Sequence, residues 1–359
     1  MKILQICSAR KIGGGETHLA ELSNALARRG HQVSFAFAPG SPLVSRVQNI
    51  APENILFTRM RNSLDVFSAR ELAKFASHHN IEIIHAHLAR DYPLAALAAR
   101  LSQTPFVLTR HVLFPLKRIQ KYALKNVGGI IAPSKAVAAE LRHQNLFPPE
   151  IIQTIHNGID PEHFTRADKN QNTNFTVGTI GQLAPIKGHD VFIRAAAIVL
   201  QERRDIQFII VGEDKSRSGE NRREIENLIA ELNLQTHIEL AGWTDDVRPF
   251  LHKFDLFVSA ARSEPFGLVI IEAMAARIPV IATESEGAAE IIEDGASGIL
   301  IPLENHEKLA KAVLDLAGNS AQRDHLRNAG RRRVEDNFSL EKMVSETERF
   351  YCRVLQNAS

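Results

Sequence analysis

Two glutamates stand on either side of a short apolar stretch at the end of a predicted strand. Glu264 and Glu272 are separated by seven residues, which begin with Pro-Phe-Gly. The run 256–261 (LFVSAA) predicts a buried strand, and the run 268–276 (LVIIEAMAA) predicts a helix. Glu264 would lie just before this helix and Glu272 about one turn inside it. Because a carboxylate accepts hydrogen bonds from two hydroxyls at once, Glu272 suits a ribose and Glu264 suits a second sugar.

The turn between the two glutamates has the composition of an anion site. Pro265 prevents the helix from extending back into the strand, and Gly267 removes a side chain where the backbone must approach a ligand. After Phe266, the amides of Gly267 and Leu268 would be unpaired N–H groups at a helix start, which favour a phosphate. The stretch therefore predicts binding of a sugar, a diphosphate and a ribose in that order. The alternative interpretation is a buried helix flanked by two solvated glutamates.

Two other segments could also meet phosphate groups. The glycines at 13–15 follow the predicted strand 2–7, and such turns bring backbone amides to a phosphate. The run is not G-x-G-x-x-G, and the second strand, 32–38, ends without an acidic residue for a ribose, so a nicotinamide-binding domain is disfavoured. Lys187 lies between a strand end and a helix start, where its ammonium could neutralise a diphosphate. The alternatives are a flexible turn and a surface lysine.

Three histidines lie on predicted strands. His111 ends the strand 105–111, at the carboxyl edge where ligands bind in such sheets. His85 and His87 alternate along one strand face, which would suit a metal pair, but no third ligand is evident and core or supporting roles are favoured. The sequence also has no Asp-x-Asp pair to hold a metal on a diphosphate. We therefore expect no metal site and metal-independent chemistry.

The composition sets the class of protein. The length of 359 residues favours two domains, and 44% apolar with 23% charged residues is typical of a soluble globular protein. No apolar run approaches the ~18 residues that span a bilayer, and the start MKILQICSAR is interpreted as a first strand and not a signal peptide. Cys7 and Cys352 lie at opposite ends of the chain, which predicts reduced thiols and a cytoplasmic protein.

The charge is divided unevenly along the chain. Residues 1–165 hold 19 Lys and Arg against 11 Asp and Glu, a net charge of +8, whereas 166–359 hold 24 against 30, a net charge of −6. A basic half could meet an anionic surface or acceptor. Residues 113–126 predict a basic amphipathic helix that could rest on anionic lipid headgroups, with the alternative of a solvated face on a core-packed helix. Its basic residues are Lys117, Arg118, Lys121 and Lys125, and its apolar ones are Leu116, Ile119, Tyr122 and Leu124.

Alternation of strands and helices predicts two doubly wound α/β domains with parallel sheets. We expect an N-terminal domain over 1–165, a second over 166–335 beginning with an exposed linker at 166–174, and a C-terminal helix over 336–359 that crosses back to the first. Two such facing domains would leave a cleft where strand ends and helix starts converge. The expected strands are 2–7, 32–38, 81–87, 105–111 and 128–134, then 175–181, 206–212, 237–243, 256–261, 278–283 and 298–302.

Seven segments in a shared order resemble one known family nearly end to end. They are GGGETHLAELSNALARRGH, IIHAH, APSKAVAAEL, HNGID, GQLAPIKGHDVFIRAAA, SEPFGLVIIEAMAARIPVIAT and GAAEIIEDGASGILIP. They resemble the retaining glycosyltransferases of family 4, which have a GT-B fold. The resemblance implies transfer of a sugar from a nucleotide-diphosphate-sugar, such as a UDP- or GDP-sugar, with the anomeric configuration kept. The implied acceptor is a hydroxyl of a glycan or lipid-linked precursor such as lipopolysaccharide. No further cofactor and no nucleic-acid partner is expected.

The resemblance also implies roles for individual residues. The Gly14–Gly15 loop would close onto the donor phosphates and the acceptor, and His111 would touch the donor sugar. The family usually has an arginine where this chain has Gln182, which leaves Lys187 as the main cation. Arg262, Lys215 and Arg217 are candidates to compensate. The expected catalytic residues are Glu264, His111 and Lys187, and the expected donor-binding residues are Gly14, Gly15, Gln182, Lys187, Glu264, Phe266, Gly267, Leu268 and Glu272.

Three other functions stay open from the sequence. A nucleotide-sugar epimerase of the same fold would consume donor without an acceptor. A non-catalytic nucleotide-sugar-binding protein would bind donor without turnover, and the pairing of Glu264 with Lys187 argues against it. A dehydrogenase is disfavoured by the missing dinucleotide fingerprint. The nucleobase cannot be read, because bases in such clefts are often held by backbone near turns such as 242–246 (GWTDD).

Overall fold

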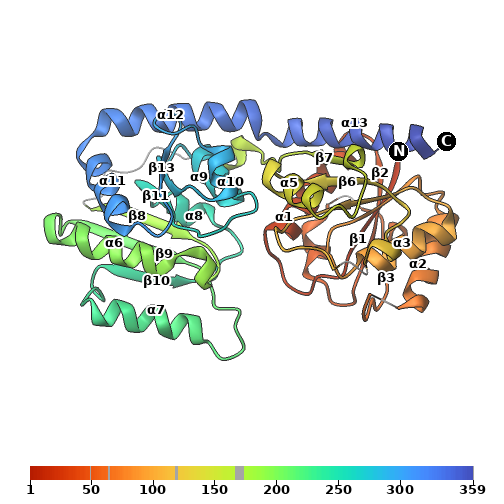
Figure 1. Ribbon diagram of the computed structural model, residues 1–359, viewed down its shortest axis with the longest axis horizontal. Helices are drawn as coiled ribbons and strands as arrows, with labels where there is room; N and C mark the ends of the chain where they lie inside the picture. Colours follow the sequence, from red (N-terminus) through yellow and green to blue (C-terminus); the bar gives the residue numbers. More distant parts are fainter. Residues whose placement is uncertain (49, 64, 118–119, 166–173, 359) are drawn as a thin grey trace. The chain divides into compact units, whose positions relative to one another are not determined.

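The computed structural model describes residues 1–48, 50–63, 65–117, 120–165 and 174–358. The chain forms two compact units, one of residues 1–158 and 340–359 and the other of residues 159–339 (Figure 1). The sequence placed the two boundaries after residues 165 and 335. In the structure they fall after residues 158 and 339, and the second one follows α12 (Ser320–Asn337). Most of the expected linker, residues 166–173, lies outside the described residues.

The first unit is built on a seven-stranded parallel sheet with the order β3-β2-β1-β4-β5-β6-β7. Its strands are short, apolar and rich in β-branched residues, as expected for a sheet buried on both faces. Along β1, Leu4 and Ile6 enter one core cluster while Ile3 and Cys7 enter the other. The strands are β1 (Lys2–Cys7), β2 (Gln32–Phe37), β3 (Ile55–Phe57), β4 (Ile83–Ala86), β5 (Phe106–Thr109), β6 (Val127–Ala132) and β7 (Ile152–Thr154).

Helices cover both faces of this sheet. One core cluster includes residues of α2 (Val66–His78), α3 (Tyr92–Ser102) and α5 (Lys135–His143). The opposite cluster includes residues of α1 (Gly14–Arg28) and of the C-terminal helix α13 (Leu340–Ala358). The remaining helix, α4, is a single turn over Gln120–Ala123, and short 3-10 segments are η1 (Pro42–Arg46), η2 (Pro52–Asn54) and η3 (Pro149–Ile151).

The C-terminal helix α13 is part of the first unit although it follows the second in sequence. Tyr351 is fully buried, and its hydroxyl lies 2.6 Å from Nδ1 of His85 on β4. At the same helix, Glu348 pairs with Arg29 and with His31 at the end of α1. These contacts attach the last residues of the chain to the first sheet.

The second unit has a six-stranded parallel sheet with the order β10-β9-β8-β11-β12-β13. Its strands are β8 (Phe175–Ile180), β9 (Ile206–Val211), β10 (Ile238–Gly242), β11 (Leu256–Ser259), β12 (Val280–Thr283) and β13 (Ile299–Ile301). Its helices are α6 (His189–Glu202), α7 (Glu220–Glu231), α8 (Arg248–Leu251), α9 (Leu268–Ala275), α10 (Glu286–Ile291), α11 (His306–Gly318) and α12, with 3-10 turns η4 (Pro161–Phe164) and η5 (Pro185–Lys187). In this unit β8 and β11 are neighbours although β9 and β10 separate them in sequence, so the sheet reverses its winding there.

The predicted pair of Rossmann-like α/β domains is confirmed, and every expected strand is present within a few residues. The short edge strands β3 and β7 were not predicted. The helix predicted over 113–126 is wrong: only Gln120–Ala123 is helical, and residues 118 and 119 lie outside the described residues. Pro115 interrupts the segment, and the amide of Leu116 donates to Gln144 Oε1 at 2.9 Å instead of to a helical carbonyl.

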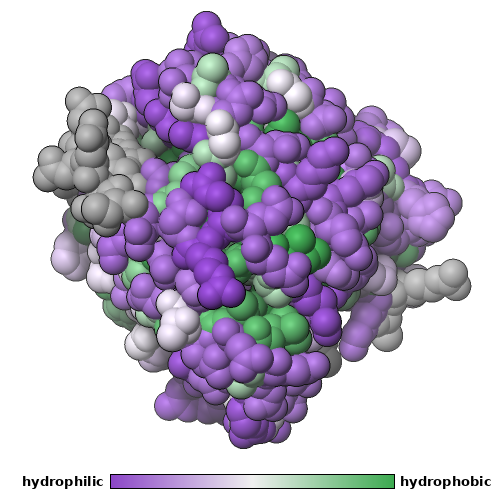
Figure 2. Space-filling model, turned by 90° about the vertical axis from the view of Figure 1, so that its left-hand side faces the viewer, coloured by the Kyte–Doolittle hydropathy of each residue, from purple (hydrophilic) through white to green (hydrophobic). Residues whose placement is uncertain are grey.

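The surface and the cysteines agree with the composition. Figure 2 shows a face over the second unit that is mainly hydrophilic, with apolar side chains in small groups. Among the described residues, the longest and most apolar helices still fall short of what a membrane crossing requires. Both cysteines are free thiols, as predicted, with Cys7 buried and Cys352 exposed.

The packing of α13 against β6 leads to the first prediction. A methyl group at Gly129 would lie 2.5 Å from Cζ of Phe350 and 2.8 Å from Cγ2 of Val354. We expect Gly129→Ala to lower the free energy of unfolding by about 1–3 kcal/mol, because the helix must move away from the sheet. The measurement is urea unfolding followed by circular dichroism.

The control is Gly318→Ala, since no atom lies within 4 Å of the added methyl there. The double variant Gly129→Ala with Phe350→Leu replaces the opposing ring by a smaller side chain. It should recover part of the lost free energy of unfolding. An unchanged urea midpoint for Gly129→Ala would show that α13 does not pack on this strand.

Candidate functional site

The start of α9 has backbone N–H groups that donate to no other described residue. Gly267, the residue before the helix, has φ of +109°, a conformation that favours glycine. A methyl group there would also lie 3.0 Å from Cδ1 of Ile270. Within the described residues, the N–H groups of Gly267 and Leu268 donate no hydrogen bond. The predicted helix start is therefore present, and its geometry is that of an anion-binding terminus.

Lys187 and Glu264 form an ion pair beside this helix start. Lys187 Nζ lies 2.5 Å from Glu264 Oε2, and the two side chains are 28% and 13% exposed. Lys187 ends the 3-10 turn η5, which follows β8, and Glu264 follows β11. The strands β8 and β11 are the neighbours at which the sheet reverses its winding, so the ion pair connects the loops that follow them. The sequence analysis paired these two residues, and the structure places their side chains in direct contact.

A glycine permits the close approach of these two loops. Gly188 has φ of +65°, and a methyl group at this position would lie 1.9 Å from the carbonyl oxygen of Ala260, just after β11. No side chain could be accommodated without moving the backbone that leads to Glu264. Gly188 thus holds Lys187 next to the end of β11.

The turn that carries Glu264 is also fixed by α10. The carbonyl of Glu264 accepts a hydrogen bond of 2.8 Å from the N–H of Gly287. The N–H of Glu264 donates to Glu286 Oε2 at 3.2 Å, and the hydroxyl of Ser263 donates to the same carboxylate. Phe266, which is predicted to bind donor, has a buried side chain whose ring lies edge-on against Phe338. Phe266 therefore supports the turn through packing.

Glu272 lies on the first turns of α9 and is partly buried. Burial, and then the negative charge of Asp246, raises the pKa of Glu272 from 4.5 to about 7. Within the described residues its carboxylate has no hydrogen-bond donor. The side chain is therefore an acceptor available for a ligand, and near neutral pH it exists in both protonation states.

Gln182 and the three cations suggested to compensate for its missing charge have different surroundings. The side chain of Gln182 is exposed. The main-chain carbonyl oxygen of Gln182 accepts a hydrogen bond from His189 Nε2 at 3.0 Å. Arg262 forms bidentate contacts with Asp190 and also pairs with Glu304, so its charge is already neutralised. Lys215 lies 3.6 Å from Glu213 and 4.9 Å from the ring centre of Trp243. Arg217 is exposed.

In the first unit, Gly14 and Gly15 begin helix α1, and Gly15 lies beside His111. A methyl group at Gly15 would lie 3.4 Å from the imidazole ring of His111. The N–H of Gly13 donates to Glu16 Oε2 at 2.9 Å, so this carboxylate caps the helix. The structure thus brings together the glycine turn and the histidine that the sequence could not connect.

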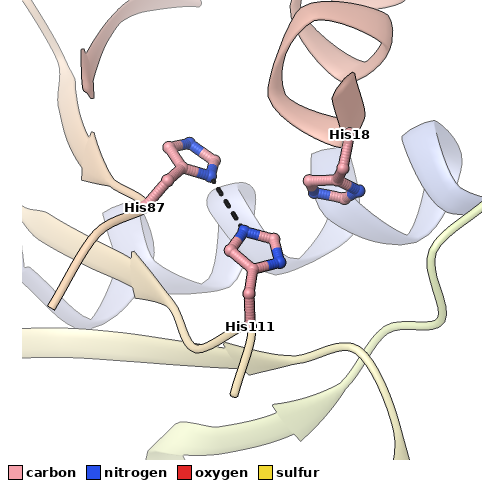
Figure 3. Close-up of side chains that lie close together, drawn as sticks. All are labelled: His18, His87 and His111. Carbon is pink, nitrogen blue, oxygen red and sulfur yellow. Dashed lines mark hydrogen bonds between the residues drawn. The ribbon is translucent and has the colours of Figure 1, made fainter. Parts of the chain in front are cut away.

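His111 belongs to a cluster of three imidazoles with His18 and His87 (Figure 3). His18 comes from α1, His87 follows β4 and His111 follows β5, so all three lie at the carboxyl edge of the sheet. Burial lowers the pKa of His18 to about 4 and holds the pKa of both other rings well below 6.5. The three rings are therefore neutral at physiological pH.

His85 does not form the metal pair considered from the sequence. Its Nδ1 lies 2.6 Å from the hydroxyl of Tyr351, and its Nε2 lies 2.7 Å from the hydroxyl of Thr109. Both ring nitrogens are thus occupied, and His85 is a core histidine. The sequence analysis missed His18, whose only signal was its position four residues after Gly14, and it missed Glu286 and Gly287 in the segment EGAAE.

Two family models match consecutive parts of the chain. The model described as Glycosyltransferase Family 4 matches residues 12–163, and the model described as Glycosyl transferases group 1 matches residues 161–333. An uncharacterized glycosyltransferase of Methanocaldococcus jannaschii is 33% identical over 284 residues, which cover 76% of this chain and 75% of that protein. The N-acetyl-alpha-D-glucosaminyl L-malate synthase of Bacillus anthracis is 26% identical, over 96% of this chain and 95% of that protein.

The fold matches a solved structure over nearly its whole length. The crystal structure of Anabaena HepE in complex with UDP and glucose has a TM-score of 0.85 at 21% sequence identity. The match covers 97% of this chain and 98% of that chain. This likeness confirms the predicted GT-B fold class.

The raised pKa of Glu272 leads to a prediction about stability. Because the folded protein holds the proton of Glu272 up to about pH 7 and the unfolded chain releases it near 4.5, ionisation lowers stability as the pH rises. Glu272→Gln should therefore match the wild type near pH 4, below the unfolded pKa, and be more stable at pH 8, by roughly 2 kcal/mol. Urea unfolding of both proteins at several pH values measures the difference. A difference that does not change with pH would contradict the buried, ionisable carboxylate.

Proposed function

The chain belongs to glycosyltransferase family 4, and from this membership we propose that it transfers a sugar from a nucleotide-diphosphate-sugar to a hydroxyl acceptor with retention of anomeric configuration. The observation that carries the proposal is the Lys187–Glu264 ion pair beside the unpaired amides of α9. A positive charge, free N–H donors and a carboxylate meet there at the winding reversal of the sheet.

The diphosphate is the part of the donor that this arrangement suits best. The N–H groups of Gly267 and Leu268 and the dipole of α9 favour phosphate oxygens. Lys187 supplies the charge that stabilises the nucleoside diphosphate as the glycosidic bond breaks. With Gln182 uncharged and Arg262 paired to two carboxylates, most of this stabilisation falls to Lys187 and the amides. This source of charge needs no metal bridge on the diphosphate.

The two acidic residues bind hydroxyls in this proposal. Glu272 accepts hydrogen bonds from the ribose, a role for which its unpaired carboxylate is suited. Glu264 orients the donor sugar while Lys187 holds its carboxylate. The neighbours of known structure include a complex with UDP and glucose, which supports a UDP-sugar as the first donor to test.

Retention follows from a front-face mechanism. A carboxylate held 2.5 Å from an ammonium is a weak nucleophile, so a covalent intermediate on Glu264 is disfavoured. The bond from the anomeric carbon to the phosphate oxygen breaks, and the acceptor oxygen bonds to the same face. The acceptor proton passes to the departing phosphate oxygen, which balances the reaction.

The first unit would contribute His111 and the Gly14–Gly15 turn to the reaction, and would receive the acceptor. We propose a lipid-linked or anionic glycan acceptor and peripheral contact with the cytoplasmic face of a membrane. The support is a basic surface with two exposed aromatic rings, Phe114 at 70% and Tyr122 at 69% exposure. Three exposed lysines lie in the same segment, namely Lys117, Lys121 and Lys125.

The donor is identified by a binding screen. Thermal shifts are measured with UDP-, GDP- and ADP-sugars, and the sugar that stabilises the protein most is tested for release of nucleoside diphosphate with and without acceptor. Transfer to an acceptor with the α or β configuration unchanged supports the proposal. An altered sugar without acceptor would indicate an epimerase, and binding without turnover across an acceptor panel would indicate a non-catalytic module.

The ion pair yields the sharpest test by substitution. Lys187→Ala and Glu264→Ala should each lower kcat by about 10²–10³-fold, the size expected when one stabilising group is lost from a transition state. The melting temperature should change little, because both side chains are partly exposed. Lys311→Ala on α11 is the matched control, since its side chain is exposed and unrelated to the helix start. Near-normal turnover of either variant would remove that residue from the mechanism.

A further inference from the structure

Three imidazoles in the first unit gather at the carboxyl edge of the sheet. One ring nitrogen from each of His18, His87 and His111 lies within 4.8 Å of the other two (Figure 3). The rings come from three segments far apart in sequence, namely α1 and the loops after β4 and β5. Among the described residues this is the one group of histidine, cysteine and acidic side chains with such spacing.

The separation of two of these nitrogens fits a shared metal ion. His87 Nδ1 and His111 Nε2 are 3.5 Å apart. Hydrogen bonds to nitrogen donors are usually 2.7–3.2 Å long, so this contact is long for a direct bond. Two nitrogens bound to one tetrahedral Zn²⁺ at 2.0–2.1 Å lie about 3.3 Å apart. One nitrogen of His18 lies within 4.8 Å of both, so His18 must move closer when an ion binds.

The surroundings leave ring nitrogens available. His87 Nε2 donates to Gln5 Oε1 at 2.8 Å, which leaves the lone pair of Nδ1 directed at His111. His18 is 5% exposed, and its Nδ1 has no hydrogen-bond partner. The buried Nδ1 of His111 also lacks one. Buried polar atoms without partners are costly, and an ion bound to Nδ1 of His18 would relieve that cost at this ring.

We propose that His18, His87 and His111 bind a divalent transition metal, with Zn²⁺ the best fit and a fourth position left open. Neutral imidazoles suit Zn²⁺, Co²⁺ or Ni²⁺, whereas Mg²⁺ and Ca²⁺ require oxygen ligands. The group contains no carboxylate among the described residues, and Glu16 and Asp91 already have partners, because Glu16 caps Gly13 and Asp91 accepts from Ser8. The site therefore selects soft and intermediate metals over the hard ions that bind phosphates.

Metal binding would inhibit the reaction. This consequence rests on the proposed function, in which His111 acts on the donor sugar. Coordination of Zn²⁺ through Nε2 would fix the orientation of the His111 ring, so the ring could no longer turn to contact a sugar. Because Gly15 lies against the same ring, a coordinated His111 would also hold the glycine turn in place. Zn²⁺ is thus an inhibitor of this enzyme and not its cofactor.

The direct test uses full-length protein without a histidine tag, treated with chelator and then titrated with Co²⁺ and Zn²⁺. We expect one equivalent of Co²⁺ to give the visible absorption of a tetrahedral site, and Zn²⁺ to displace it. His18→Ala should weaken binding by about 100-fold, whereas His78→Ala, an exposed histidine on α2, should bind like the wild type. Absence of the cobalt spectrum, or equal binding by His18→Ala, would overturn the site.

The inhibition is tested separately, with turnover measured in chelator and in added Zn²⁺. Because the His18 ring packs against His111, the turnover of each variant in Zn²⁺ is expressed relative to the turnover of the same variant in chelator. Zn²⁺ should inhibit the wild type and the His78→Ala control at about 100-fold lower concentration than His18→Ala. Equal inhibition of all three would overturn the coupling. The cobalt titration needs no substrate, so it tests the metal site independently of the proposed function. A protein that is inactive on every donor would contradict the proposed function, and the cobalt spectrum would still decide whether the metal site exists.

Discussion

In the proposed function, the neutralisation of a diphosphate at the start of one short helix is the constraint on which the second unit is organised. Gly267 and Leu268 leave two N–H groups without partners among the described residues, and Lys187 brings an ammonium to the same turn through its contact with Glu264. Glu264 balances the charge of that ammonium, and the ion pair holds the two side chains together. A ligand phosphate then meets donors that are already in position, which lowers the reorganisation required for catalysis.

Glycines make this arrangement possible because two loops approach each other without side chains between them. Gly188 lies against the backbone of Ala260, and a methyl group at Gly287 would lie 2.0 Å from the carbonyl oxygen of Phe266. The first contact sets the position of Lys187 and the second sets the turn that carries Glu264. In the first unit, Gly15 lies against His111 in a similar way. Each reacting group is thus placed by backbone packing and not by its own flexible side chain.

The sequence was sufficient for the two α/β domains and for the helix start, because strand–helix alternation and the Pro-Phe-Gly turn are local patterns. It could not show which side chains meet across segments. The pairing of Arg262 with Asp190, the support of Glu264 by Glu286 and the meeting of His18 with His87 all depend on strand order. The predicted helix at 113–126 failed for a local reason, since apolar spacing suggested a helix that Pro115 interrupts.

The most direct test of the central claim is a crystal structure with the nucleoside diphosphate that stabilises the protein most. The account predicts phosphate oxygens within about 3.2 Å of the backbone nitrogens of Gly267 and Leu268 and close to Lys187 Nζ. It also predicts the ribose hydroxyls at the carboxylate of Glu272. A nucleotide bound with its diphosphate elsewhere, and with the Lys187–Glu264 pair and the amides of α9 untouched, would contradict the account.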